Sequence, residues 1–314
     1  MSFSGDAKAV IALTTRLGDS GRPSLSPTRW DRFATALADA GLSPADVFSA
    51  EFDPALPGVA QDVAESVRAL LADAAAATVA AAELDQMGIW TLTIVDDGYP
   101  AALSERLGRL APPILYGAGP AALLAEQGIA IVGSRNVDEA GAVAAGEVAR
   151  VAVEAGYTVV SGGARGVDQL AMNAAFMGGG RVLGVLADSL QARIRKPDVL
   201  RALDSGTTAL ITQQVPLAGF TPGSAMGRNK LIYALSRVTM VIASDLDTGG
   251  TWAGAVEALK AKNGVVAVWR GPGEGPGNER LAELGAVPVR TADEVLACLD
   301  IEPPAPPEQL SWME

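Results

Sequence analysis

The sequence predicts an α/β protein in which a helical N-terminal domain precedes a Rossmann-like, doubly wound and mainly parallel sheet. From residue 128 onward, short apolar runs alternate with segments that are rich in helix formers. Strands that are apolar on both faces and joined by helices are typical of a parallel sheet with helices on both sides. The first 87 residues differ from this pattern, because they are rich in alanine and carry helix-capping signals.

The N-terminal residues 1–87 are expected to be helical. Ser26-Pro27 and Ser43-Pro44 each place a hydroxyl-bearing N-cap before a proline at the first helical position. The stretch from Val59 to Leu84 contains no glycine or proline and is dominated by strong helix formers. It therefore predicts one long helix.

The pattern changes at Gly88, where residues 89–94 are β-branched and aromatic enough to predict a strand. Seven further strands are predicted at 129–133, 157–161, 181–187, 207–212, 238–243, 264–269 and 286–289. Helices are predicted at 138–155, 167–177, 197–205, 228–236, 251–262, 278–284 and 291–299. The expected organisation is a helical domain over 1–87, a Rossmann domain over 88–300 and a proline-rich tail over 301–314, which composition predicts to be disordered.

Composition narrows the class of protein. No apolar run is long enough to span a bilayer, and the N-terminus lacks the pattern of a secretory signal, so a cytoplasmic protein away from membranes is expected. The single cysteine, Cys298, fits a reducing compartment. Because the chain has no histidine, catalysis by an imidazole base and a histidine-ligated metal are excluded. No metal, cofactor or catalytic residue is expected.

The charge is unevenly distributed along the chain. The formal net charge is −12 at pH 7, which by itself disfavours an anionic partner. Residues 133–237, however, contain 11 basic and 8 acidic residues, whereas the remainder contains 13 basic and 28 acidic residues. A weakly basic centre is compatible with a confined anion site, because the local potential decides such binding.

Two glycine-containing motifs follow predicted strands. Gly133-Ser134-Arg135 comes directly after the first parallel strand, where free N–H groups of a helix N-terminus and an arginine suit a phosphate. The second motif runs from Ser161 through Gly162, Gly163 and Arg165 to Asp168. Its glycines indicate close backbone approach, Arg165 a phosphate contact, and Asp168 either a helix cap or a ligand-orienting carboxylate.

Two more motifs follow. Arg228-Asn229-Lys230 is predicted to open a helix, where two cations oppose the helix dipole unless an anion lies nearby. Phe220, in the long loop before it, is either a base-stacking side chain or a hydrophobic plug. Thr248-Gly249-Gly250-Thr251 places two glycines and a hydroxyl at a helix start, which suits a phosphate.

Because the motifs are assigned to the carboxyl ends of strands, one crevice can contain all of them. The residues predicted to bind DNA or phosphate are Gly133, Ser134, Arg135, Ser161, Gly162, Gly163, Arg165, Arg228, Asn229, Lys230, Thr248, Gly249, Gly250 and Thr251. Arg193, Arg195 and Lys196 are predicted to form an outer basic lip. The residues alone do not choose between a small nucleotide and a polymer.

Taken in order, these segments resemble the DNA-processing protein A (DprA/Smf) family. The resemblance begins at Gly88, includes Tyr99-Pro100 and the motifs above, and ends at Gly285-Ala286. It implies a non-catalytic protein of DNA processing, recombination or uptake that binds single-stranded DNA, forms homodimers and assists a RecA-type recombinase. This chain departs from the family pattern at Met172, Lys196 and Gln214 and has a longer 214–227 loop, and it is expected to lack the family's winged-helix domain.

Two alternatives stay open. The same superfamily includes enzymes that cleave nucleotide N-glycosidic bonds, in which a glutamate follows the glycine-rich motif by three residues. Here Glu257 lies six residues beyond Thr251, which places its carboxylate on another helix face. Either Glu257 or Asp168 would have to act as the acid–base group. The other alternative, a scaffold in a multiprotein defence complex, is suggested by the acidic flanks.

Overall fold

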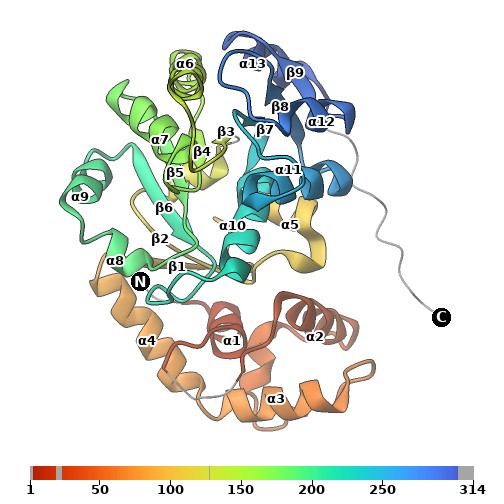
Figure 1. Ribbon diagram of the computed structural model, residues 1–314. Coiled ribbons are helices and arrows are strands. Elements are labelled where there is room, and N and C mark those ends of the chain that lie inside the picture. Colours follow the sequence, from red (N-terminus) through yellow and green to blue (C-terminus); the bar gives the residue numbers. More distant parts are fainter. Residues whose placement is uncertain (1–2, 19–22, 127, 303–314) are drawn as a thin grey trace.

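The computed structural model describes residues 3–18, 23–126 and 128–302, and it contains a nine-stranded sheet of order β1-β2-β6-β5-β4-β3-β7-β8-β9 (Figure 1). The pairs β1–β2 and β2–β6 are antiparallel and the other pairs are parallel, which confirms the mainly parallel sheet. The strands are β1 Trp90–Thr93, β2 Ile114–Ala118, β3 Gly128–Val132, β4 Val159–Ser161, β5 Val182–Val185, β6 Thr208–Thr212, β7 Ser236–Val241, β8 Val265–Trp269 and β9 Val287–Val289.

Thirteen α-helices and four 3₁₀ helices are found in the described residues. The α-helices are α1 Gly5–Thr14, α2 Pro27–Asp39, α3 Gln61–Leu71, α4 Ala74–Gln86, α5 Ala101–Leu107, α6 Glu139–Glu154, α7 Val167–Met177, α8 Leu190–Arg193, α9 Pro197–Asp204, α10 Pro222–Leu235, α11 Gly249–Ala261, α12 Asn278–Glu283 and α13 Glu294–Ala297. The 3₁₀ helices are η1 Pro44–Phe48, η2 Gly108–Leu110, η3 Ala121–Ala125 and η4 Cys298–Asp300.

The strand order places a switch point beside β3. The chain runs from β3 through β4 and β5 to β6 on one side, and then returns to β7 and continues to β9 on the other side. In a doubly wound sheet, the crevice outside the carboxyl ends of the two strands at this point is the usual ligand site. Here that crevice lies between β3 and β7.

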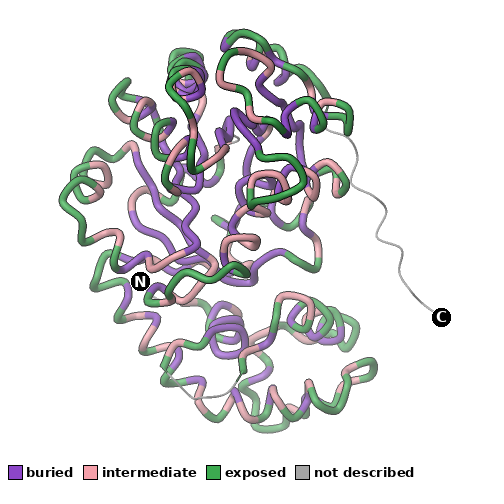
Figure 2. Tube along the Cα trace, in the orientation of Figure 1, coloured by how far each residue is buried: buried purple, intermediate pink, exposed green. Residues whose placement is uncertain are grey.

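Helices cover both faces of the parallel strands, as the apolar runs predict. Along β3, Ile129 and Ile131 pack in a core cluster with α6 and α7, whereas Ala130 and Val132 pack with α10 and α11. This alternation follows from the period of two in a strand. Figure 2 shows buried residues concentrated along the strands, with exposed residues on the outer helices.

The N-terminal helices share a hydrophobic core with the sheet. Ile11 of α1 and Ala81 of α4 belong to one buried cluster with Tyr116 of β2 and Leu210 of β6. The hydroxyl groups of Thr15 and Tyr116 form a buried hydrogen bond of 2.5 Å. These contacts hold α1 and α4 against the antiparallel edge of the sheet. The division of the chain at residues 87 and 88 stays a prediction.

The single long helix expected over residues 59–84 is wrong. Two helices, α3 and α4, are separated at Asp73, whose φ of −105° and ψ of 7° are not those of a continuous helix. Val67 and Leu70 of α3 are buried among the N-terminal helices, whereas Ala81 and Leu84 of α4 are buried against the sheet. The two helices run in different directions in Figure 1, so each packs on its own cluster, and the chain turns at Asp73.

The predicted start of the helix at residue 228 is also wrong, because α10 begins at Pro222. The Thr221 hydroxyl accepts a hydrogen bond from the backbone N–H of Ser224, whose hydroxyl accepts one from the N–H of Thr221. This reciprocal capping and the proline at the first position define the start. Arg228 therefore lies within α10, and the helix dipole gives no reason for an anion beside it.

The sheet ends at β9, a three-residue edge strand whose central Pro288 is exposed. The strand at 114–118, β2, was not among the predicted strands. The proline-rich stretch Pro303 to Pro307 lies outside the described residues. Within the described parts of the chain, no helix is long and apolar enough to cross a membrane.

Candidate nucleic-acid interface

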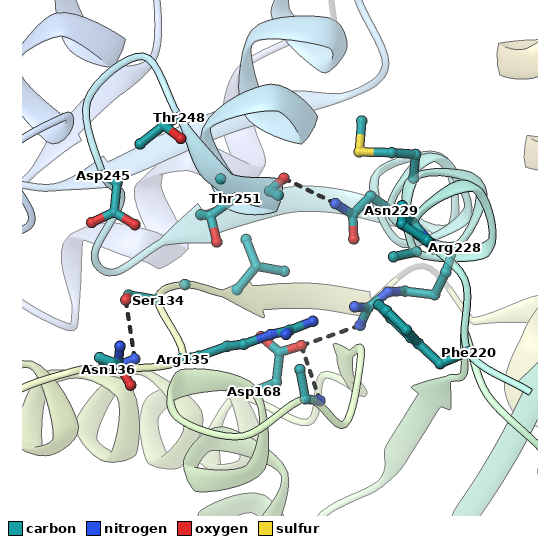
Figure 3. A pocket seen from close by; sticks show the side chains of 18 of the residues that line it. Ser134, Arg135, Asn136, Asp168, Phe220, Arg228, Asn229, Asp245, Thr248 and Thr251 are labelled. Atoms are coloured by element: carbon teal, nitrogen blue, oxygen red, sulfur yellow. Dashed lines mark hydrogen bonds and ion pairs between the residues drawn. The ribbon is translucent and has the colours of Figure 1, made fainter.

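A cavity of about 480 Å³ opens at the switch point (Figure 3). Each of the four sequence motifs contributes to its lining. The residues that line it include Gly133, Ser134, Arg135, Asn136, Ala164, Asp168, Phe220, Arg228, Asn229, Tyr233, Asp245, Thr248, Gly249, Gly250 and Thr251. Segments that are more than 100 residues apart in the sequence thus meet in one crevice, as their positions after the strands predict.

Arg135 extends from the end of β3 toward this cavity. Its guanidinium carbon lies 5.7 Å from the centre of the Phe220 ring, in a cation–π arrangement. Arg135 is exposed, and no carboxylate within the described residues forms an ion pair with it. Its charge is therefore available to an incoming anion. Phe220 is about half exposed, so the hydrophobic-plug interpretation does not describe it.

Gly133 and Ser161 have structural roles. A Cβ on Gly133 would lie 2.6 Å from a methyl carbon of Val167, so glycine allows the end of β3 to pack against α7. Ser161 is fully buried, and its hydroxyl donates to the Ile131 carbonyl at 2.6 Å. The hydroxyl therefore joins β4 to β3, and Ser161 does not line the cavity.

Gly163 and Arg165 lie beside the main cavity. Together with Gly162 they line a neighbouring cavity of about 320 Å³, which shares Arg135 and Phe220 with the main one. The Arg165 guanidinium donates to the Asn136 side-chain oxygen at 2.6 Å. The loop after β4 is thus linked to the loop after β3, and Arg165 faces the smaller cavity.

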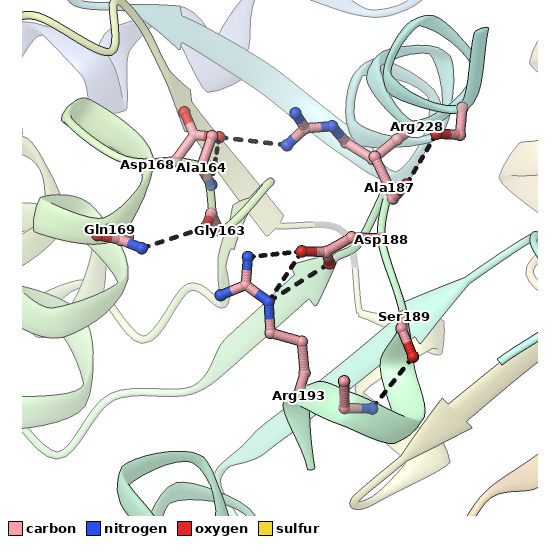
Figure 4. Close-up of polar contacts among 11 residues, drawn as sticks. Gly163, Ala164, Asp168, Gln169, Ala187, Asp188, Ser189, Arg193 and Arg228 are labelled. Atoms are coloured by element: carbon pink, nitrogen blue, oxygen red, sulfur yellow. Dashed lines mark hydrogen bonds and ion pairs between the residues drawn. The ribbon is translucent and has the colours of Figure 1, made fainter. Parts of the chain in front are cut away.

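The floor of the main cavity is a buried ion pair. Nη1 of Arg228 lies 3.2 Å from Oδ2 of Asp168, and the two side chains are 8% and 7% exposed (Figures 3 and 4). Burial raises the pKa of Asp168 above its usual value, against the opposing effects of Arg228 and the Ala164 N–H. The Arg228 guanidinium occupies the space that a side chain at residue 162 would take, since a Cβ on Gly162 would lie 1.1 Å from Nη1 of Arg228.

Two polar atoms beside this pair have no hydrogen-bond partner in the described part of the chain. They are Nε of Arg228 and the hydroxyl oxygen of Tyr233. Burial also raises the pKa of the Tyr233 phenol. Because Asp168 neutralises much of the Arg228 charge, Arg228 organises the floor of the cavity and Arg135 carries its accessible positive charge.

Asn229 and Lys230 face different surroundings. The Asn229 side-chain amide donates to the Gly250 carbonyl at 3.0 Å and so joins α10 to the start of α11. Lys230 does not line the main cavity, and its Nζ lies 3.0 Å from Oε1 of Glu257. Two residues correspond to about 200° around a helix, so Arg228 and Lys230 cannot face the same crevice.

The fourth motif forms the start of α11. Thr248 is the N-cap, and Gly249, with a φ of +84°, is the first helical residue. The first N–H groups of a helix have no intrahelical partner, and they attract anions. They occur here beside the hydroxyls of Thr248 and Thr251 at the cavity wall. The motif therefore offers N–H donors and hydroxyls to a phosphate, with the Asp245 carboxylate close to Gly249.

The predicted outer lip differs from the prediction, because one of its three cations is paired with a carboxylate and the other two do not line these cavities. Arg193 forms hydrogen bonds of 2.9 to 3.3 Å with the Asp188 carboxylate (Figure 4). Arg195 and Lys196 are exposed and line neither of these two cavities. Sequence reasoning missed Asn136, Tyr233 and Asp245 as lining residues. Asn136 and Asp245 could have been identified in the sequence only by their positions, shortly after β3 and β7.

Comparisons with known proteins identify the family of this chain. A family model described as DNA recombination-mediator protein A matches residues 90–300. The DNA processing protein DprA of Streptococcus pneumoniae is 28% identical over 218 residues, which are 66% of this chain and 73% of that protein. A putative DprA of Mycobacterium tuberculosis is 31% identical over 193 residues, which are 59% of this chain and only 49% of that protein.

Solved structures show the same fold. The crystal structure of DprA from Streptococcus pneumoniae superposes with a TM-score of 0.69 at 20% identity, covering 96% of this chain and 99% of that one. DprA from Helicobacter pylori, described as binding single-stranded DNA, gives a TM-score of 0.55 at 24% identity, covering 67% and 95%. Since the family model matches residues 90–300, which are most of this chain, the chain belongs to the DNA recombination-mediator protein A family.

Proposed function

We propose that this chain binds single-stranded DNA in the crevice at the switch point, and that it acts in DNA processing, recombination or uptake without catalysing a reaction. One observation carries the proposal: Arg135, which has no ion-pair partner among the described residues, and the N-terminus of α11 lie at the same cavity. Membership of a DNA recombination-mediator family supports DNA as the anion.

The shape of the crevice favours a single strand. A cavity of about 480 Å³ between α10 and α11 can receive part of a flexible strand. A duplex is stiff over about 150 base pairs, so bending its backbone into such a cavity would cost energy. Because the contacts are to phosphate, we propose binding with little sequence preference. A RecA-type recombinase and a second copy of this chain are the proposed protein partners.

We expect the affinity for a fluorescent 25-nucleotide single strand to fall steeply with salt. The slope of log affinity against log salt should be about −0.7 for each phosphate neutralised. Fluorescence anisotropy at a series of KCl concentrations measures it, with the corresponding duplex as the control. An affinity that does not change with salt, or tighter binding of the duplex, would contradict the proposal.

The placement of Glu257 and Asp168, the two carboxylates considered as acid–base groups, does not favour catalysis; a further carboxylate, Asp245, lines the cavity and is exposed. Glu257 is paired with Lys230 and does not line the main cavity. Asp168 does line it, but its side chain is only 7% exposed and is paired with Arg228. A general acid or base must reach the proton that it transfers. Neither group is free to do so at the mouth of the cavity.

We therefore expect no release of free base from nucleoside monophosphates. Chromatography of the reaction products after long incubation measures this, and Glu257→Gln should bind single-stranded DNA like the parent. Release of ribose 5-phosphate that disappears in Glu257→Gln or Asp168→Asn would instead identify the protein as a nucleotide hydrolase.

A further inference from the structure

The turn of residues 275–278 contacts the chain that leaves β7 and leads to the start of α11. We infer that Asn278, which lies outside the cavity, is a positioning residue for the phosphate-binding end of the crevice. This inference rests on the proposed function. According to this inference, the buried side-chain amide of Asn278 holds the loop formed by residues 242–248 in place.

The side chain of Asn278 is fully buried and makes three hydrogen bonds. Its Oδ1 accepts from the backbone N–H of Ser244 at 2.9 Å. Its Nδ2 donates to the Ile242 carbonyl at 2.7 Å and to the Trp269 carbonyl at 2.8 Å. One amide thus joins the chain after β7 to the end of β8, and only a side chain with one acceptor and two donors can do this.

The backbone of the turn packs directly against the same loop. The N–H of Gly277 donates to the Ser244 carbonyl at 2.8 Å. A Cβ on Gly275 would lie 2.3 Å from the Ser244 oxygen, and one on Gly277 would lie 2.3 Å from the Asp245 oxygen. Both sites are therefore restricted to glycine. The turn thus holds residues 244 and 245 through its backbone as well as through the Asn278 side chain.

Beyond residues 244 and 245, the loop continues into the cavity wall. Asp245 and Thr248 both line the cavity, and Asp247 between them has a φ of +56°. Residues 242–248 form no helix or strand, so nothing regular fixes Thr248 except the two ends of the loop. At one end the loop joins α11. At the other, Asn278 holds Ile242 and Ser244, beside backbone hydrogen bonds that join residues 242 and 243 to the end of β3. Loss of that amide should therefore let the N-terminus of α11 shift relative to Arg135.

The experiment compares Asn278→Ala with Tyr116→Phe, which also removes a buried hydrogen bond, the one to Thr15, remote from the crevice. Binding of a single-stranded 25-mer is measured by anisotropy at a temperature at which both variants are folded. Backbone hydrogen exchange is measured in parallel. Each fold-change in affinity reports a free-energy difference, and we expect Asn278→Ala to bind about tenfold more weakly. Its exchange should accelerate over 242–251, while Tyr116→Phe binds like the parent.

A second variant covers the case in which Asn278→Ala does not fold. Gly277→Ala keeps the amide but directs a Cβ at the Asp245 carbonyl, so it should displace the same loop and weaken binding in the same way. Parent-like binding by the folded variants, or exchange over 242–251 that does not change, would overturn the inference. If the parent itself does not bind the oligonucleotide, the proposed function is wrong. Unchanged hydrogen exchange over 242–251 in Asn278→Ala would separately show that Asn278 does not hold the loop.

Discussion

Replacing Arg228 by alanine is expected to lower the free energy of unfolding by about 3 to 5 kcal/mol. The variant leaves the Asp168 carboxylate buried without its cation, and the pKa of that carboxyl is already raised by burial in the parent. The cost is therefore mainly that of a buried charge with no partner.

Urea unfolding followed by circular dichroism measures this effect. Arg201 provides the matched control, because it is an exposed arginine on α9 and its loss should change stability by less than about 0.5 kcal/mol. A double variant, Asp168→Ala with Arg228→Ala, should lose less than the sum of the two single variants, since it no longer buries an unpaired charge. Parent-like stability of Arg228→Ala would show that the pair does not support the floor of the crevice.

Replacing Arg135 by alanine is expected to weaken single-stranded DNA binding by about 10- to 100-fold, the range for a lost hydrogen bond to a charged group. The exposed guanidinium lies over Phe220 at the cavity, with no carboxylate partner in the described residues. Stability should therefore change little, in contrast to the Arg228 variant. The salt slope should become less negative by about 0.7 if one phosphate contact is lost.

The control for Arg135 is Arg150→Ala, which removes the same charge from an exposed position of α6. Arg150 forms an exposed ion pair with Glu154 and does not line the cavity. Equal losses of affinity in the two variants would mean that overall charge, rather than the crevice, attracts the DNA. A normal affinity of Arg135→Ala at all salt concentrations would exclude Arg135 from the site.

The parallel part of the fold could be predicted because buried strands are apolar on both faces. β3, β4, β5, β6, β7, β8 and β9 all fall on predicted apolar runs. The break at Asp73 could not be predicted, because it depends on α3 and α4 being buried in two different cores. The start of α10 was predictable in principle, since Thr221-Pro222 has the same capping pattern as Ser26-Pro27.

The convergence of the four motifs could be predicted, because each was assigned to the carboxyl end of a strand. The roles of single residues could not. The phase of α10 decides that Arg228 faces the cavity and Lys230 faces Glu257. Because the start of α10 was predicted at the wrong residue, the direction in which each of its side chains points could not be predicted. The pairing of Arg228 with Asp168 joins residues 60 positions apart, and no local pattern indicates it. The choice of Arg135 as the accessible cation follows from that pairing.

The proline in β9 limits how copies of this chain can associate. The N–H of Arg270 donates to the Val289 carbonyl, so the backbone groups of Val289 face β8 and those of Pro288 face outward. An added strand would find no N–H donor at that central position. Sheet extension across this edge, the route to fibrous self-association, is therefore disfavoured. The β9 edge is thus a poor contact surface for a second copy of this chain, and the other edge of the sheet is β1.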